Sequence, residues 1–193
     1  MAFIKDNYPQ LWAYFDKSES LFIDFSFCDD NPERLKGFVP DVLIPYFTLI
    51  GRSENGSLIC LWQFKPDLDK QQQPIVYLDS ENYFHSVIAA NVLQFLTLLP
   101  YSMGGICQML YSWKRYLQQP EEYDLPLKRH NSRALKTLTK QIAENYPDYD
   151  EFVSWLVSNE QIEPSVTPAR LIKENMDAYP NLTDWLKTES SEP

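Results

Sequence analysis

The chain has 193 residues, of which 44% are apolar and 23% are charged, and its formal net charge is −10. This length and apolar content suffice for a domain with a substantial hydrophobic core and argue against general disorder. The negative charge would repel a phosphate backbone, which argues against a general nucleic-acid-binding role, and no apolar run is long enough to span a membrane.

The first half of the chain has the patterns of β-strands. Apolar or alternating runs occupy residues 21–27, 46–50, 57–64, 74–78 and 83–89. The second and third runs are joined through Asn55 and Gly56, a strong signal for a β-hairpin because both residues tolerate a positive φ. These runs predict a mainly antiparallel sheet over about residues 21–89.

Two segments between the runs carry their own signals. Pro40 and Pro45 favour an extended or edge conformation, because proline fixes φ and lacks an amide donor. Residues 65–73 are polar and include three consecutive glutamines, so we expect a loop there.

The second half of the chain has helical periodicity, with apolar residues three and four positions apart. Expected helices begin at Asn91, Gly104, Asn131 or Ser132, Asp148 or Asp150, Thr167, and Asn181 or Thr183. Pro168 suits the first helical position after Thr167. Residues 118–129 are expected to connect two helices, and residues 188–193 to form a frayed tail. The sequence therefore predicts an α+β fold, with a sheet packed against helices and a helical C-terminal half.

Charge is distributed unevenly along the chain. Residues 112–140 hold seven bases and three acids, a net charge of +4, whereas residues 141–193 hold three bases and eleven acids, a net charge of −8. Pairing between helices would explain this arrangement, and so would plain solvation of the charges. A third explanation is an acidic surface that docks a basic partner.

Few residues carry reactive side chains, and no nucleotide-binding or hydrolase motif is present. Cys28, Cys60 and Cys107 are far apart in the sequence and are expected to be reduced thiols, as in a cytoplasmic protein. His85 and His130 leave little scope for a metal site. We therefore expect no enzymatic activity, no cofactor and no metal.

Asp79 and Glu81 leave one catalytic alternative open. Two carboxylates at this spacing would suit acid–base chemistry in a small hydrolase. The sequence Asp-Ser-Glu-Asn between two strands is equally well explained as a turn.

Aromatic residues make up 15% of the chain. Those on apolar faces are expected to pack in the core: Phe25, Phe47, Trp62, Phe95, Trp113 and Trp155. Others have more polar neighbours: Tyr8, Trp12, Tyr14, Phe15, Tyr116, Tyr123, Tyr146 and Tyr149. Aromatics near acids suit a protein interface, so Tyr123 and Tyr149 are candidate contacts.

A family resemblance covers residues 40–99. A strand ends at residues 49–51, and Asn55-Gly56 precedes a strand that carries Trp62. A proline-led strand then ends in the acidic turn at residues 79–81, and a further strand leads into a helix with Phe95 and Leu96. This series resembles the core of the SMI1/KNR4 family, also called the SUKH superfamily. Many members carry an acid after the Asn-Gly pair, where this chain has Ser57.

The resemblance implies a single domain over residues 1–193, with a core at 20–100 and a helical extension at 101–193 that the resemblance does not cover. It also implies a binding role. Bacterial members resemble immunity proteins that neutralise a toxin domain by binding it, and fungal relatives look like interaction scaffolds.

The leading hypothesis is therefore a cytoplasmic immunity-type protein that binds a basic toxin domain and neither nucleic acid nor a membrane. We expect a monomer or weak dimer. The candidate contacts are Glu54, Asp79, Glu81, Tyr123 and Tyr149. A scaffold or regulatory module of the same fold, without a toxin partner, is the alternative.

Overall fold

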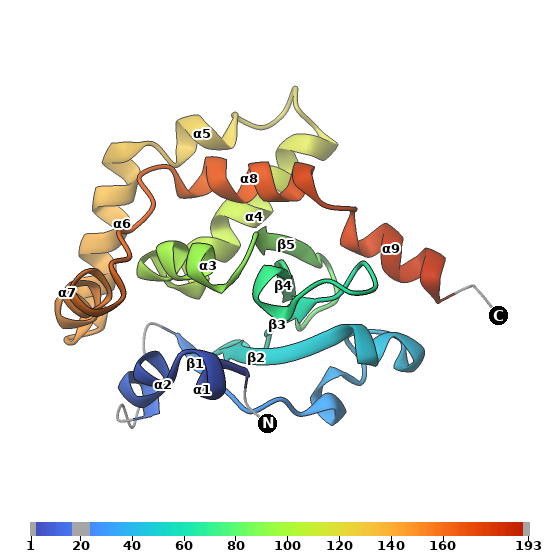
Figure 1. Ribbon diagram of the computed structural model, residues 1–193. Helices are drawn as coiled ribbons and strands as arrows, with labels where there is room; N and C mark the ends of the chain where they lie inside the picture. Colours follow the sequence, from blue (N-terminus) through green and yellow to red (C-terminus); the bar gives the residue numbers. More distant parts are fainter. Residues whose placement is uncertain (1–2, 17–23, 191–193) are drawn as a thin grey trace.

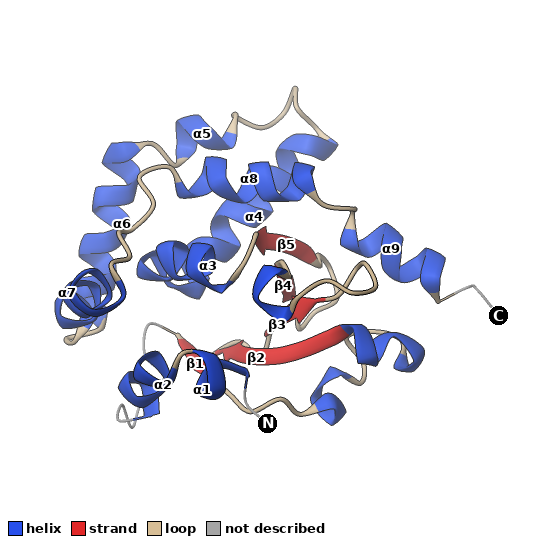
Figure 2. Cartoon of the chain, viewed as in Figure 1, coloured by secondary structure: helices blue, strands red, loops and turns tan. Residues whose placement is uncertain are grey.

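A computed structural model describes residues 3–16 and 24–190. Within these ranges, five strands form one antiparallel sheet in the order β1-β2-β3-β4-β5. The strands are β1 (Phe25–Phe27), β2 (Phe47–Ser53), β3 (Leu58–Trp62), β4 (Ile75–Leu78) and β5 (Ser86–Ala89). Each strand pairs with its neighbour in the sequence, so the sheet is a meander with helices around it (Figure 2).

Helices precede the sheet and follow it. The α-helices are α1 (Phe3–Asn7), α2 (Pro9–Asp16), α3 (Val92–Leu98), α4 (Ser102–Gln118), α5 (Pro126–Arg129), α6 (Ser132–Asn145), α7 (Tyr149–Glu160), α8 (Pro168–Ala178) and α9 (Leu182–Glu189). In the view of Figure 1, α6 and α7 lie at one end of the molecule and α9 at the other. The fold is α+β with a helical C-terminal half, as the sequence predicts.

The predicted hairpin is present, but its turn is longer than two residues. The amide of Gly56 donates to the carbonyl of Ser53 over 3.0 Å, and the amide of Ser53 donates to the carbonyl of Ser57 over 2.9 Å. Of the two central residues of the motif, Gly56 has a positive φ, of 87°, and Asn55 does not. The loop is therefore a turn closed by a left-handed glycine, which leaves Glu54 at its tip.

The sheet is buried on both faces. One face packs on α-helices. The apolar cluster on this face combines Phe25, Ile59 and Tyr77 of the sheet with Phe152 of α7 and Ile172 of α8. The helical extension therefore completes the same core as the sheet.

The opposite face of the sheet holds a second apolar cluster. Leu49, Cys60 and Trp62 project from the strands into it, and Leu182 and Leu186 of α9 complete it. The short 3-10 helices Pro32–Leu35 and Asp41–Tyr46 also cover this face, through Leu35 and Leu43.

Several helix starts follow from local sequence. The side chains of Asn91, Asn131 and Asn181 cap α3, α6 and α9 by accepting backbone amides of the first turn. Pro168 occupies the first turn of α8, as expected. These caps supply acceptors for amides that have no partner within the helix.

Some sequence predictions are wrong in detail. The segment with Pro40 and Pro45 is a 3-10 helix, Asp41–Tyr46, rather than an extended strand. The polar loop at 65–73 contains the 3-10 helix Lys70–Gln72, and the connector at 118–129 contains α5. Pro126 occupies the first turn of α5, where its missing amide costs no hydrogen bond, whereas Pro45 lies inside its 3-10 helix.

Strand boundaries also differ from the predictions. The run at 21–27 yields β1 only from Phe25, and residues 21–23 lie outside the described ranges. The run at 83–89 pairs only from Ser86, because residues 79–83 form a turn. Helix α9 extends to Glu189, so the predicted tail is helical at its start, while residues 191–193 are also outside the described ranges.

Trp185 of α9 tests how strongly the second face depends on this helix. Its ring centroid lies 5.2 Å from that of Trp62 and 6.2 Å from that of Phe47. We expect Trp185→Ala to lower the free energy of unfolding by about 2–4 kcal/mol, measured by urea denaturation, because it removes a large aromatic side chain from the cluster. Val166→Ala, at a side chain that is 83% exposed, should change it by less than about 0.5 kcal/mol. Equal losses in both variants would contradict this role for α9.

Candidate functional site

A cavity of about 270 Å³ lies between the β2–β3 hairpin and the first turns of α4. Its lining residues are Asp24, Ser53, Glu54, Asn55, Met103, Gly104 and Cys107. Three separate parts of the chain therefore meet here: the residue before β1, the hairpin and the start of α4. Two of the lining side chains are carboxylates, and no lining residue is basic.

Asp24 caps α4 from outside the helix. Its φ of 57° is left-handed, and its carboxylate accepts the amide of Met103 over 2.6 Å and that of Gly104 over 2.8 Å. A Cβ atom at Gly104 would lie 3.1 Å from Oδ2 of Asp24, so glycine at this position permits the close approach. The negative charge also faces the positive end of the helix dipole.

Ser102 completes the cap. Its φ of 57° is not helical, and its hydroxyl oxygen accepts the amide of Gly105 over 3.2 Å. The same hydroxyl forms a hydrogen bond with the carboxylate of Asp24. The first amides of α4 thus have side-chain partners, and Asp24 is held in a fixed position.

The charge of Asp24 is not balanced by a base. Burial raises the pKa of its carboxyl and repulsion from Glu54 raises it further, although hydrogen bonds from Gly104, Met103 and Ser102 oppose the shift. Among the described residues, no lysine, arginine or histidine forms an ion pair with Asp24 or Glu54. The site therefore holds negative charge in a partly desolvated position.

Glu54 and Tyr146 lie close to Asp24. The amide of Glu54 donates to the carbonyl of Asp24 over 2.9 Å, while the Glu54 side chain is exposed at the hairpin tip. Tyr146 follows the last residue of α6, and its pKa is raised by burial and then by the charges of Asp24 and Glu54. The negative potential of the two carboxylates thus extends to the end of α6.

A polar network lies behind the cavity. The hydroxyls of Ser57 and Tyr77 are 2.8 Å apart, and the amide of Ser80 donates to Oγ of Ser57 over 3.0 Å. Ser57 is fully buried, and these hydrogen bonds give it a structural role. Cys107 hydrogen-bonds with Tyr77, and burial raises the pKa of its thiol to about 11. That thiol is protonated at neutral pH and is a poor nucleophile.

Asp79 is a structural residue and not a surface contact. Its side chain is 2% exposed, and its carboxylate accepts the amide of Tyr83 over 3.0 Å, the hydroxyl of Tyr111 over 3.1 Å and the amide of Glu81 over 3.4 Å. These bonds hold the turn after β4. Because these oxygens are buried and already bonded, the structure gives no support to the prediction that Asp79 contacts a partner.

Glu81 lies on the same turn, with its side chain exposed to solvent. It contributes its backbone amide to Asp79. The buried Asp79 and the exposed Glu81 do not form a paired-carboxylate arrangement, so the geometry gives the hydrolase alternative no support.

Tyr123 and Tyr149 have different settings. Tyr123 is 37% exposed and lies 6.0 Å from the guanidinium of Arg115 at the end of α4, apart from the acidic cavity. Tyr149 is 7% exposed and belongs to the main core cluster, so its position gives no support to the prediction that it contacts a partner. Phe15 is buried too, in contact with Phe25 and Phe27. The stack of Tyr14 on Trp155, with ring centroids 4.5 Å apart, joins α2 to α7.

The structure thus brings one of the five predicted residues, Glu54, into the cavity. Sequence reasoning missed Asp24, Met103 and Gly104, and treated Cys107 only as a core thiol. Asp24 carried a signal, as the acid within an otherwise apolar run, and so did the pair Gly104-Gly105 at a helix start. Neither signal says that these residues, about 80 positions apart, meet.

Within the described part of the chain, no group of three or more His, Cys, Asp or Glu side chains is arranged to hold a metal ion. No described helix is both long and apolar enough to cross a bilayer. No known protein family, curated protein or solved structure matches this chain.

His85 makes stability depend on pH. Its Nδ1 accepts the amide of Asp79 over 3.1 Å, which requires that nitrogen to be unprotonated. Burial lowers the pKa of His85, although Asp79 and a hydrogen bond with the Phe38 backbone oppose the shift. A folded-state pKa below the unfolded value means that the unfolded chain takes up the proton first. Stability is therefore present above the unfolded pKa and is lost as pH falls.

We expect the free energy of unfolding to decrease between about pH 7.5 and pH 5.5, with a slope of at most about 1.4 kcal/mol per pH unit for each histidine. Urea denaturation at several pH values measures this decrease. Burial also lowers the pKa of His130, so His85→Gln should reduce the slope without abolishing it. An unchanged slope in His85→Gln would contradict the role assigned to His85.

Proposed function

We propose that this protein is a cytoplasmic, immunity-type binding protein that neutralises a basic toxin domain by direct contact. The observation that carries the proposal is the cavity between the hairpin and α4, where Asp24 and Glu54 have no ion-pair partner among the described residues. The resemblance to the SMI1/KNR4 family supports the same class of function. The proposal involves no cofactor and no enzymatic step.

The chemistry of the cavity suits a lysine or arginine side chain. Its aliphatic stem would pack against Met103, and its charged head would pair with Asp24 and Glu54. Because Asp24 is already desolvated and fixed by α4, little further ordering is needed when the cation arrives. The cation would also relieve the repulsion between the two carboxylates.

The acidic block after residue 140 favours the same kind of partner. The described ion pairs are Lys36–Glu33, Lys140–Glu144 and Lys173–Asp177, each between residues three or four positions apart. Pairing between helices therefore does not account for the acidic block after residue 140. Burial raises the pKa of Tyr14 to about 12, and Glu151 of α7 and Asp148, which precedes this helix, add to the shift, so the start of α7 presents negative charge as well.

Affinity capture from the native host tests the proposal. The tagged protein should retain, at one-to-one stoichiometry, a basic polypeptide encoded by a neighbouring gene, identified by mass spectrometry. Asp24→Asn combined with Glu54→Gln should weaken its binding at least about tenfold, because both charges that meet the cation are lost. Binding of the purified pair is measured by calorimetry.

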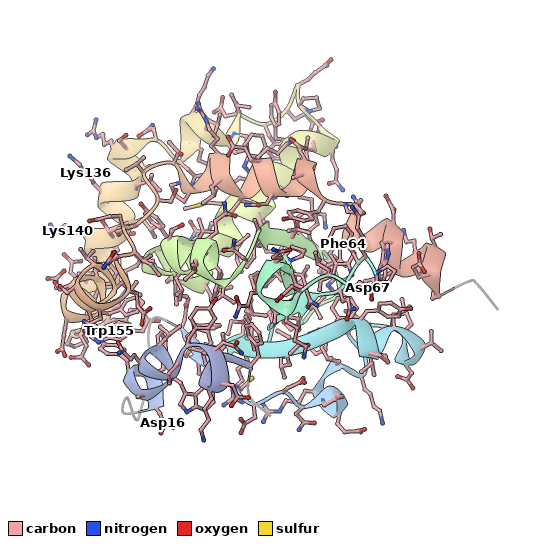
Figure 3. All side chains as sticks on the ribbon, viewed as in Figure 1. Asp16, Phe64, Asp67, Lys136, Lys140 and Trp155 are labelled. Atoms are coloured by element: carbon pink, nitrogen blue, oxygen red, sulfur yellow. The ribbon has the colours of Figure 1, made fainter. Side chains whose placement is uncertain are left out.

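A matched control separates this cavity from general charge. Asp67→Asn combined with Glu174→Gln removes the same two charges at exposed positions that do not line the cavity. Figure 3 shows Asp67 beside Phe64, on the opposite side of the view from Trp155. Equal losses in the two double variants would contradict the role of the cavity. Recovery of several unlinked proteins instead of a neighbouring gene product would favour the scaffold alternative.

The rate of association should depend on salt. Raising ionic strength from about 0.05 M to about 0.5 M should slow association of the two proteins at least about tenfold, because salt screens attraction between an acidic and a basic surface. Stopped-flow fluorescence measures the rate. The dissociation rate should change little. An association rate that does not depend on salt would contradict electrostatic attraction.

A further inference from the structure

A second cavity, of about 410 Å³, lies where α4, α5 and α6 meet. Gln108 of α4 lines it, together with Arg129, His130 and Arg133 from the junction of α5 and α6. No acid is among the described residues that line this cavity. In a chain with a net charge of −10, a cavity lined by two arginines and no acid is an exception.

The two arginines are free to bind an anion. Both side chains are exposed, and neither forms an ion pair with an acid among the described residues. In the stretch from residue 112 to residue 140, Lys140 is the base with an ion pair, which it makes with Glu144 of its own helix. Charges in solvated positions near one another repel, so a bound anion would stabilise this arrangement.

His130 fixes the junction against α4. The hydroxyl of Ser112 donates to the carbonyl of Gln108 over 2.7 Å, so its oxygen accepts the N–H at Nε2 of His130 over 3.1 Å. Arg129 precedes His130 in the sequence and Arg133 follows it, so both arginines belong to a segment that is held in place.

Asn131 holds the same junction along the chain. Its Nδ2 donates to the carbonyl of Lys128 over 2.7 Å, and its Oδ1 accepts the amides of Arg133 over 3.0 Å and Ala134 over 3.1 Å. Since these amides at the start of α6 are already bonded, the arginine side chains supply the positive charge for a ligand.

The cavity also has an apolar side. Ala134, Leu135 and Leu138 of α6 line it together with the arginines. A ligand that combines an anionic group with an apolar body would fit both sides, whereas a small inorganic ion would use only one of them.

We propose that this cavity binds a phosphate monoester carried on an apolar group, with Arg129 and Arg133 holding the phosphate and Leu135 and Leu138 contacting the apolar group. A phosphate monoester carries nearly two negative charges at neutral pH, which matches two guanidinium groups. Guanidinium groups bind phosphate oxygens through paired N–H donors, which favours arginine for this ligand. The site is separate from the acidic cavity and does not depend on the binding function proposed there.

Calorimetry with the full chain and phenyl phosphate tests the proposal. Arg129→Gln combined with Arg133→Gln should weaken binding at least about tenfold, because both donors to the phosphate are lost. Lys136→Gln combined with Lys140→Gln is the matched control, since it removes two charges from exposed positions of the same helix that do not line the cavity. Figure 3 shows Lys136 and Lys140 on the outer side of α6. Circular dichroism checks that each variant is folded.

The expected result is tight binding of phenyl phosphate to the wild type and to the lysine variant, and weak binding to the arginine variant. Inorganic phosphate and benzoate should both bind more weakly than phenyl phosphate, because one lacks the apolar group and the other carries a single charge. Comparison of a short phosphotyrosine peptide with phenyl phosphate distinguishes the sources of the ligand. Tighter binding of the peptide indicates a phosphorylated protein, and equal affinity of the peptide and phenyl phosphate indicates a small molecule.

Three outcomes would overturn the proposal. The first is no binding of phenyl phosphate to the wild type at millimolar concentration. The second is equal weakening in the arginine and lysine variants, which would show attraction by general charge alone. The third is equal affinity for inorganic phosphate and phenyl phosphate, which would remove the apolar side from the site.

Discussion

Strand β3 has no exposed side chain, and this constraint organises the rest of the molecule. Leu58, Cys60 and Trp62 lie in one apolar cluster, and Ile59 and Leu61 lie in the other. A sheet whose central strand is apolar on both sides must be covered on both faces. The main helices cover one face, while α9 and short 3-10 helices cover the other. The N-terminal and C-terminal helices are therefore parts of the core rather than additions to it.

The acidic cavity arises where this packing joins the sheet to the longest described helix. Asp24 caps α4 at Met103 and Gly104, and the same residue bonds through its carbonyl to Glu54 of the hairpin. The cap stabilises α4, but the burial and the nearby charge of Glu54 disfavour the ionised carboxylate. Local electrostatic cost at a well-ordered position is typical of sites that bind an oppositely charged group. The disfavoured negative charge of Asp24 therefore supports the proposal of a basic partner over a structural role alone.

The two proposed sites divide the surface of the molecule by charge. The acidic cavity lies at the start of α4, and the cavity with Arg129 and Arg133 lies alongside α4 near Gln108 and Ser112. Helix α6 reaches from one cavity to the other. Its first turn carries Arg133, and Tyr146, which follows its last residue, has its pKa raised by burial and by the charges of Asp24 and Glu54. The proposed cation site and the proposed anion site thus lie near opposite ends of the same helix.

The sequence by itself determined the elements that depend on near neighbours: the Asn55-Gly56 hairpin, the cap at Asn91 and the apolar pattern of the strands. For α6 and α9 it offered two candidate caps each, and the structure shows that Asn131 and Asn181 are the caps. These follow from turn geometry, capping and periodicity, which act over a few residues. It predicted Glu54 at the hairpin tip. It did not reveal that Asp79 and Tyr149 are buried, because their neighbours in the sequence are polar. Only the tertiary structure decided that Asp24 meets Gly104 and that α9 covers Trp62. Such contacts join residues far apart in the chain, and they depend on how whole layers pack rather than on any local preference.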